Sequence, residues 1–528
     1  MCVKYYNFLR MIEYSEIRKE PTIMKKQRLI SLLLALTMLA SSAALLSCSS
    51  GTENADDAAA VNTDTPTAGE EVAAETEPQK DSLEARMDVS DELPEKKFDG
   101  RKFAIIGDDA CMEHYLSDEL SGEPVNDAVF ERNTEICERF DITLDAVVYP
   151  EANITGQAQN SVVAGDDAFQ MMACHIIYLG MSATNDYMYN WYDLPYVNFD
   201  QPWWSDSTVT DLKYKDKAFI AIGDFALSAL SSTYCMFYNK VMAESYGLPD
   251  MYELVAEGAW TIDKQYEFSE GVYMDTNGDG VRDQNDTYAL TTDCKSNANT
   301  YLWAFGKKIA TQQEDCTYVL DYYDEKLVEI VEKLYNLYYE TDYVFFDTSS
   351  HGIGQTVFPL GNNLFTNGYI GWANAALRDV EFDYGIIPYP KWDEKQEDYY
   401  TSVDGGHEGL AILKSIRDTE FVGVIAEALN AESWKRVVPA YYDVSLKFKG
   451  ARDEQSIAML DRIVNSRIFD FGYVYGGWGC VFWIQYLLEG ASKDITSYYQ
   501  KNFKPYNKSM EKVFEAFDEY TTTAAGNP

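Results

Sequence analysis

Short apolar runs alternate with segments of helical periodicity in the part of the chain that begins near residue 100. The runs "KFAIIG" (102–107) and "ITLDAVVY" (142–149) have the length and composition of buried strands, and "NDAVFERNTEICERF" (126–140) between them places apolar residues at helical spacing. A strand, a crossover helix and a second strand predict two parallel strands of one sheet.

The alternation continues toward the C-terminus, so the pattern predicts an α/β fold. Thr261 suits the N-cap of a helix, and "KVMAESYGL" (240–248) has helical spacing. Further strands are expected at 218–224, 233–240, 383–390 and 409–414, with an apolar run at 368–375 and a helix-rich C-terminal part.

A basic and then apolar segment near the N-terminus has the features of an export signal. Three basic residues precede "LISLLLALTMLASSAALL" (29–46), and the segment ends in "LLSC" at Cys48. This ending resembles the bacterial lipobox, whose cysteine carries the lipid anchor, so Cys48 is the expected lipidation site. A transmembrane anchor is the competing interpretation, because the run is close to spanning length. Residues 24–47 are thus the expected signal peptide, and 1–23 an upstream start-site artefact.

Acidic residues dominate the composition. The chain has 86 Asp and Glu against 43 Lys and Arg, and its formal net charge of −43 repels nucleic acid. Between Ser49 and Glu95 there are fourteen acids, two bases and few large apolar residues. Such a segment buries too little surface to offset its ordering entropy, so residues 48–97 are predicted to be a disordered tether. The cysteines are odd in number after Cys2 and Cys48 and widely scattered, which is not a disulfide framework.

The stretch "DTNGDGVRDQND" (275–286) has the spacing of a calcium loop. Acids or amides stand at its first, third, fifth, ninth and twelfth positions, and Gly280 allows the sharp turn. The predicted ligands of a structural Ca²⁺ are Asp275, Asn277, Asp279, Val281 through its carbonyl, Asp283 and Asp286. The alternative is a solvated turn, because Gly, Asn and Asp are also ordinary turn residues.

An ordered set of segments carries a resemblance to a known family. These segments are "MFYNKVMAESYGL", "AWTIDKQYEFSEG", "DQNDTYAL", "FTNGYIGW", "DYGIIPYPKWDEKQ" and "EALNAESWKRVVPAYYDVSLKFKGARDEQSIAMLDRI". In this order they resemble the extracellular solute-binding lipoproteins of Gram-positive ABC importers, in the carbohydrate-binding group that includes maltose-binding protein. The similarity spans roughly residues 100 to 520.

The resemblance implies a two-lobed, periplasmic-binding-protein-like fold of type II, in which a ligand is held in a cleft between two α/β lobes. It places the first lobe at 98–230 and 373–413 and the second at 231–372 and 414–528. The chain would cross between them near 228–234, 371–374 and 413–414. The calcium loop would brace a helix-to-strand connection of the second lobe, away from these crossings.

The implied function is capture of a sugar or oligosaccharide and its delivery to the permease of an ABC transporter, by a monomer anchored on the extracellular face of the membrane. Aromatic residues make up 14% of the chain, and sugars pack their C–H faces on aromatic rings. The candidate aromatic contacts are Trp203, Trp204, Trp303, Trp372, Trp478 and Trp483, and the candidate polar contacts are Asp224, Asn374, Arg378 and Glu408. For each one singly, a packing or capping role is the competing interpretation.

Enzymatic motifs were sought as the alternative to binding. The sequence has no H-E-x-x-H, no G-x-S-x-G elbow and no phosphate-binding Gly-Lys-Ser/Thr loop. The chain is therefore expected not to be an enzyme. A secreted glycoside hydrolase using paired carboxylates and a cell-surface adhesion or scaffold lipoprotein stay open as alternatives.

Overall fold

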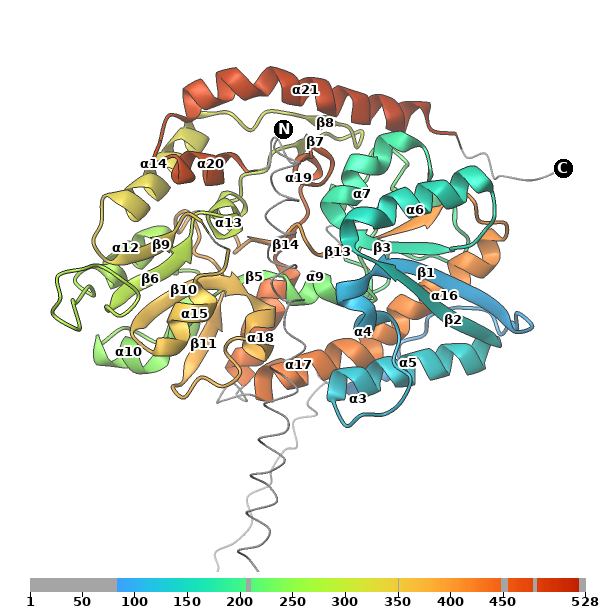
Figure 1. Cartoon of the computed structure of the whole chain (residues 1–528), viewed down its shortest axis with the longest axis horizontal. Helices are drawn as coiled ribbons and strands as arrows, with labels where there is room; N and C mark the ends of the chain where they lie inside the picture. Colours follow the sequence, from blue (N-terminus) through green and yellow to red (C-terminus); the bar gives the residue numbers. More distant parts are fainter. Residues whose placement is uncertain (1–82, 206–209, 350, 448–453, 478–481, 522–528) are drawn as a thin grey trace, which may run out of the picture. The chain divides into compact units, whose positions relative to one another are not determined.

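The structure of the protein is a computed structural model that describes residues 83–205, 210–349, 351–447, 454–477 and 482–521 (Figure 1). All of these residues belong to one unit, Thr76–Pro528. The predicted signal peptide, Cys48 and most of the predicted tether lie outside the described residues. In the described part of the chain, no helix combines the length and the apolar character that crossing a bilayer requires.

The first lobe is built on a five-stranded sheet of order β2-β1-β3-β13-β4. Its strands are β1 (Arg101–Asp108), β2 (Ile142–Tyr149), β3 (Met171–His175), β4 (Met188–Tyr189) and β13 (Glu408–Leu413). β1 pairs in parallel with β2 and β3, as the strand, helix and strand pattern predicted, whereas β13 runs antiparallel to β3 and β4. A strand from far along the chain thus completes the sheet formed by the first hundred residues of the fold.

The second lobe is built on another five-stranded sheet, of order β11-β5-β10-β6-β9. Its strands are β5 (Tyr234–Asn239), β6 (Tyr288–Asp293), β9 (Val344–Asp347), β10 (Asn363–Tyr369) and β11 (Tyr384–Ile387). β10, β6 and β9 are parallel, and β5 is antiparallel to both β10 and β11. Two α/β lobes, each a mostly parallel sheet with one antiparallel strand, β13 in the first and β5 in the second, give the two-lobed fold class expected.

Two short pairs of strands accompany the large sheets. β7 (Thr311–Gln312) pairs antiparallel with β8 (Tyr318–Val319), and β12 (Thr401–Ser402) pairs in parallel with β14 (Arg467–Ile468). β12 leads the chain from the second sheet toward β13 of the first, so the β12–β14 pair lies where the lobes are joined.

Helices cover both sheets (Figure 1). The α-helices up to β10 are α3 (Leu83–Met87), α4 (Met112–Tyr115), α5 (Pro124–Phe140), α6 (Glu151–Ala164), α7 (Ile176–Ser182), α9 (Leu227–Ser231), α10 (Lys240–Ser245), α11 (Met251–Ala256), α12 (Ile262–Ser269), α13 (Ser296–Ala304), α14 (Glu325–Tyr339) and α15 (Gly354–Val357). Those after β13 are α16 (Thr419–Glu432), α17 (Val438–Lys447), α18 (Glu454–Asn465), α19 (Phe471–Tyr475), α20 (Trp483–Glu489) and α21 (Ile495–Glu519). Short turns are η1 (Asp109–Cys111), η2 (Ala183–Asn185), η3 (Trp191–Asp193), η4 (Phe358–Leu360), η5 (Ile370–Asn374) and the π-helical η6 (Ser433–Val437).

Local sequence explains the ends of several helices. α5 starts at Pro124, where a missing N–H costs no hydrogen bond, and it ends before Asp141, which takes a left-handed conformation with φ of 50°. The Thr261 side chain accepts a hydrogen bond from the Lys264 N–H and caps α12, as the sequence predicted.

The 25-residue helix α21 contacts both lobes. Tyr499, in its first half, stacks on Tyr323 at a centroid distance of 4.1 Å, close to the start of α14 in the second lobe. Phe517, in its second half, stacks on Phe219 of the first lobe at 4.4 Å. Figure 1 shows α21 running from α14 to the region of α7.

Parts of the expected organisation are wrong. The segment 373–413 was assigned to the first lobe, but β11 pairs with β5 and belongs to the second sheet. The segment 414–528 was assigned to the second lobe, but α16 packs on α5 in the first lobe. The expected strand 218–224 makes only isolated bridges, Ala221 to Leu410 and Gly223 to Trp204.

The end of the predicted tether is also structured, in contrast to the expectation of disorder up to residue 97. Asp91 forms an ion pair with Arg139, and Leu93 is buried in the first lobe. The Arg86 guanidinium lies 4.9 Å from the Trp434 ring. These contacts supply the burial that the acidic composition alone does not, so the folded unit begins earlier than composition indicated.

Candidate functional site

The junction of the two lobes contains the cavity best suited to a ligand. The chain passes from the first sheet to the second between Ala221 and β5, and it returns through β12 to β13. Beside this junction lies a cavity of about 670 Å³. Its lining residues are Asp211, Gly306, Lys308, Asp398, Tyr399, Tyr400, Ala458, Arg462, Asn465, Ser466, Arg467 and Ile468. Ligand sites of proteins typically have volumes of about 300–1,000 Å³, so the space suits a small molecule or a short oligosaccharide.

Two tyrosines and two arginines give the cavity its chemistry. Tyr399 and Tyr400 precede β12, Arg462 lies on α18, and Arg467 starts β14. The Arg462 guanidinium lies 6.0 Å from the centroid of the Tyr399 ring. Gly306 beside Tyr400 takes a φ of 70°, which favours glycine, whereas a Cβ there would make only an ordinary 3.6 Å contact with the ring.

An ion pair joins the two lobes at the cavity. Lys308, which follows α13 of the second lobe, lies 2.8 Å from Asp211, which precedes β5 in the chain. The Tyr399 hydroxyl accepts a hydrogen bond from the Trp260 N–H, and burial raises the pKa of Tyr399. The cavity therefore offers flat aromatic surface together with fixed cations, carboxylates and amides, which is the combination that polyhydroxylated ligands require.

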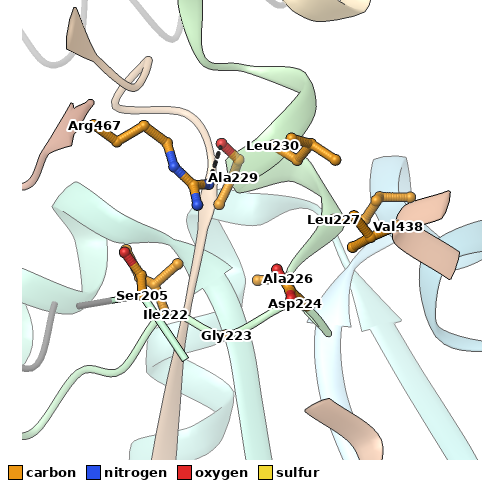
Figure 2. Close-up of a pocket in the computed structure, with 10 residues that line it drawn as sticks. All are labelled: Ser205, Ile222, Gly223, Asp224, Ala226, Leu227, Ala229, Leu230, Val438 and Arg467. Atoms are coloured by element: carbon orange, nitrogen blue, oxygen red, sulfur yellow. Dashed lines mark hydrogen bonds between the residues drawn. The ribbon is translucent and has the colours of Figure 1, made fainter. Parts of the chain in front are cut away.

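A smaller pocket of about 10 Å³ lies beside the first crossing (Figure 2). Arg467 lines it as well as the larger cavity, and its guanidinium donates a hydrogen bond of 3.4 Å to the Ala229 carbonyl. Burial raises the pKa of Asp224 in this pocket to about 7, against the lowering effect of Arg467. The space holds about one water-sized molecule, so it is a feature of the junction rather than a sugar site.

Five of the six candidate tryptophans, Trp203, Trp204, Trp303, Trp372 and Trp483, lie in the protein interior, and the contacts of three of them illustrate this. The Trp204 indole donates to Glu427 at 2.9 Å in the first-lobe core. The Trp303 indole donates to Asp470 at 3.0 Å, and the Trp372 ring stacks on Phe237 at 6.2 Å. All three are at most 3% exposed, so none of them lines either cavity.

The polar candidates are placed differently from one another. Asp224 lines the small pocket, Asn374 is half-buried at the end of η5, and Arg378 is exposed just after it. Glu408 is 1% exposed at the start of β13, where it accepts a hydrogen bond from the Ser228 hydroxyl at 3.1 Å. The structure thus brings Glu408 to the first crossing and leaves Asn374 and Arg378 outside both cavities. Trp478 lies outside the described residues.

The predicted calcium loop connects α12 to β6, as the resemblance implied, and a bridge between Met274 and Thr287 closes it. Its carboxylates accept backbone hydrogen bonds: Asp275 from Gly278 at 2.7 Å and from Gly280 at 2.9 Å, and Asp279 from Val281 at 2.7 Å. Asp286 is fully buried beneath the loop.

The bonds to Asp286 are long. Its oxygens accept from the Thr276 N–H at 3.3 Å and from the Tyr288 hydroxyl at 3.4 Å. The residues therefore fit a hard cation, because the donors are oxygens and this buried carboxylate is only weakly hydrogen-bonded.

Sequence reasoning missed the residues that line the larger cavity. Tyr399 and Tyr400 form an adjacent aromatic pair between the predicted strands 383–390 and 409–414, and this pair was the one available signal. Arg462 and Arg467 carry no motif, and they meet the tyrosines only because β14 pairs with β12.

Comparison with known proteins identifies solved structures but no closer relatives. No family model and no curated protein sequence matches the chain. A cyclo/maltodextrin-binding protein in complex with maltotetraose is 13% identical, with 81% of this chain and 100% of that chain covered and a TM-score of 0.49. UspC of M. tuberculosis is 13% identical, with 79% and 100% covered and a TM-score of 0.49. An ABC transporter solute-binding protein of Agrobacterium radiobacter K84, in complex with ribitol, is 14% identical, with 80% and 100% covered and a TM-score of 0.46.

Proposed function

We propose that the protein is a solute-binding protein that captures a sugar or oligosaccharide between its two lobes and delivers it to the permease of an ABC transporter. The 670 Å³ cavity at the lobe junction carries this proposal. Residues of the second lobe and Asp211 line it together, so a bound ligand would hold the two parts of the fold in one arrangement.

The lining chemistry favours a sugar over other small molecules. The half-buried ring of Tyr400 offers surface for C–H faces, while the amide of Asn465 and the guanidinium groups offer hydrogen bonds to hydroxyls. Both signs of charge are present, since Asp211 and Asp398 lie in the lining with Lys308 and the two arginines. A neutral, polyhydroxylated ligand suits this balance better than an anion or a cation does.

We propose binding without turnover. A glycoside hydrolase needs two carboxyl groups on either side of the bond that it cleaves. The lining of the cavity has two acids, and one of these, Asp211, is engaged in an ion pair with Lys308. An adhesion role is the further alternative, and it requires no enclosed cavity.

A ligand screen with product analysis tests the function. The unit from residue 76 onward is mixed with monosaccharides and oligosaccharides, melting temperatures are recorded, and each mixture is then analysed for products. We expect one class of sugar to raise the melting temperature and to be recovered intact. Recovery of shortened sugars would favour the hydrolase, and the absence of any hit in a broad screen would count against sugar binding altogether.

Lipid anchoring through Cys48 belongs to the same proposal. The lipobox-like "LLSC" and the acidic segment after it support a monomer tethered to the extracellular face of a Gram-positive cell membrane. Cys48→Ala should release the protein into the medium with its sugar affinity unchanged. A variant that stays in the membrane fraction would argue for a transmembrane anchor.

We also propose that the 275–286 loop binds one structural Ca²⁺. Its oxygen donors and the weakly bonded Asp286 support this. A ligand that binds only the folded state adds about 2.7 kcal/mol of stability at a hundredfold excess over Kd. Calcium should therefore raise the melting temperature, and Asp279→Ala should remove that rise while sugar binding persists. A melting temperature that is indifferent to both calcium and chelator would contradict the site.

A further inference from the structure

A second set of metal-ligating side chains lies at the edge of the first sheet. The Cys111 Sγ, a ring nitrogen of His114 and a carboxylate oxygen of Glu408 lie within 4.8 Å of one another. Among the residues that the structure describes, no other group of three His, Cys, Asp or Glu side chains meets this distance. The group is separate from the acidic calcium loop, which lies in the second lobe.

Sheet topology brings the three residues together from distant parts of the chain. Cys111 ends η1, directly after the carboxyl end of β1, and His114 follows one turn later in α4. Glu408 begins β13 and pairs with His175, the last residue of β3. Because β3 is parallel to β1, the end of β1 and the start of β13 meet at the same edge of the sheet.

Two atoms of the group accept no N–H or O–H hydrogen bond from the described residues. Glu408 is 1% exposed, and its Oε1 is one of these atoms, although Oε2 accepts from Ser228 and the carboxyl group interacts with the Cys111 thiol. The His114 Nδ1 is likewise buried and without a partner in the described chain. A buried carboxylate oxygen and a buried imidazole nitrogen that both lack a partner are costly, so the arrangement calls for a species that satisfies them.

The surrounding charge favours a cation. Asp108 ends β1 and Glu113 lies in α4, so two further acidic residues stand within three positions of Cys111 in the chain. A divalent ion would be neutralised by one thiolate and one carboxylate, so the occupied group would carry no net charge.

We propose that Cys111, His114 and Glu408 bind a divalent transition-metal ion, with Zn²⁺ as the ion that fits best. One sulfur, one nitrogen and one oxygen ligand suit Zn²⁺, whereas Ca²⁺ and Mg²⁺ take oxygen ligands alone. Three protein ligands leave the fourth tetrahedral position for a water or for a group of a bound solute. On binding, the proton of the Cys111 thiol and any proton on Glu408 pass to solvent, the sulfur and the carboxylate oxygen bind the ion, and no redox change occurs.

Cobalt substitution tests the site directly. The folded protein is titrated with Co²⁺ and then with Zn²⁺. Excess Ca²⁺ is present throughout, so that the acidic 275–286 loop does not bind the added metals. We expect a thiolate-to-cobalt charge-transfer band that saturates at one equivalent and disappears when Zn²⁺ displaces the cobalt. Cys111→Ala and His114→Ala should abolish the band. Cys137→Ala, which alters a half-buried cysteine of α5 outside this group, should keep it.

The experiment is decisive in both directions. A wild-type protein without the band, or a folded Cys111→Ala variant that retains it, would overturn the proposal. Should a variant fail to fold, the wild type alone decides the question: Zn²⁺ should slow alkylation of Cys111 at least tenfold, as mapped by mass spectrometry of the peptide, and leave that of Cys137 unchanged. Equal alkylation of Cys111 with and without Zn²⁺ would overturn the site.

Discussion

The first-lobe core and the lobe junction use aromatic rings and buried charge in opposite ways. In the core, Trp203 and Trp204 direct their indole N–H groups at one carboxylate, Glu427, at 2.8 and 2.9 Å. At the junction, Tyr399 and Tyr400 line a cavity of about 670 Å³. The core therefore satisfies its polar atoms internally, whereas at the junction the half-buried Tyr400 ring lies beside open volume, with Tyr399 buried behind the lining.

The difference shows why aromatic abundance alone did not locate a ligand site. A tryptophan whose indole is already paired and whose ring is enclosed contributes packing, and Trp204 is of this kind. A ring beside a cavity is available to a ligand, and this property depends on the volume around it rather than on residue type. Substitutions in the two regions should therefore separate stability from affinity.

The largest effect is expected from the core. Trp204→Ala removes a large buried ring and leaves the Glu427 carboxylate with one donor fewer, so it should lower the free energy of unfolding by about 3–5 kcal/mol. Denaturant titration measures the loss. Trp204→Phe keeps most of the ring and should lower the free energy of unfolding by less than Trp204→Ala does. Sugar affinity should be unchanged at temperatures where the variant is folded. If Trp204→Ala also weakened sugar binding, the separation between core residues that stabilise the fold and cavity residues that bind the ligand would be wrong.

A smaller effect, on affinity rather than on stability, is expected from the cavity. Tyr400→Ala removes one packing face for the sugar and should weaken binding about tenfold, which corresponds to about 1.4 kcal/mol. Isothermal titration with the sugar found in the screen measures this change. Tyr400→Phe keeps the ring and should bind nearly as the wild type does. Unchanged affinity in Tyr400→Ala would show that the ligand lies elsewhere.

A third effect concerns the Asp224 carboxyl group in the small pocket beside the first crossing, and it appears only as a dependence of stability on pH. The pKa of Asp224 is raised from 3.8 to about 7 in the folded protein, chiefly by burial. A raised carboxyl pKa means that the folded state holds the proton more tightly, so the stabilising contribution is complete below pH 4 and is lost as pH rises toward 7. Asp224→Asn does not titrate, so its stability relative to wild type should rise between pH 4 and pH 7 and then level off. A pH-independent difference would contradict the assignment.

The sequence predicted the elements better than the way in which they are joined. β2 (Ile142–Tyr149) has the bounds of its predicted apolar run, and α5 starts two residues before the predicted helix. Local periodicity determines such elements, because each buries one face against its nearest neighbours. The strand expected at 218–224 has the same apolar character, but its partners are single residues of β13 and of Trp204, which no local pattern reveals.

The lobe boundaries and the cavity could not be predicted for a related reason. β11 adds to the second sheet as an edge strand beside β5, although the resemblance placed it in the first lobe. The cavity combines Tyr400 with Arg467 through the pairing of β12 with β14, two residues of each strand. A pairing of only two residues in each strand produces no periodic pattern in the sequence, so the cavity could not be predicted from it.

Helix α21 is packed on both lobes, so it limits how they can move relative to one another. Its 25 residues form a rod of about 37 Å, anchored on the second lobe through Tyr499 and on the first through Phe517. Between the two anchors stands Pro505, which lacks the N–H needed for the intrahelical hydrogen bond and lowers the resistance to bending there. The helix therefore links the two lobes and bends most easily at that proline. If one lobe rotated against the other, α21 would bend there while both of its ends stayed packed on their lobes.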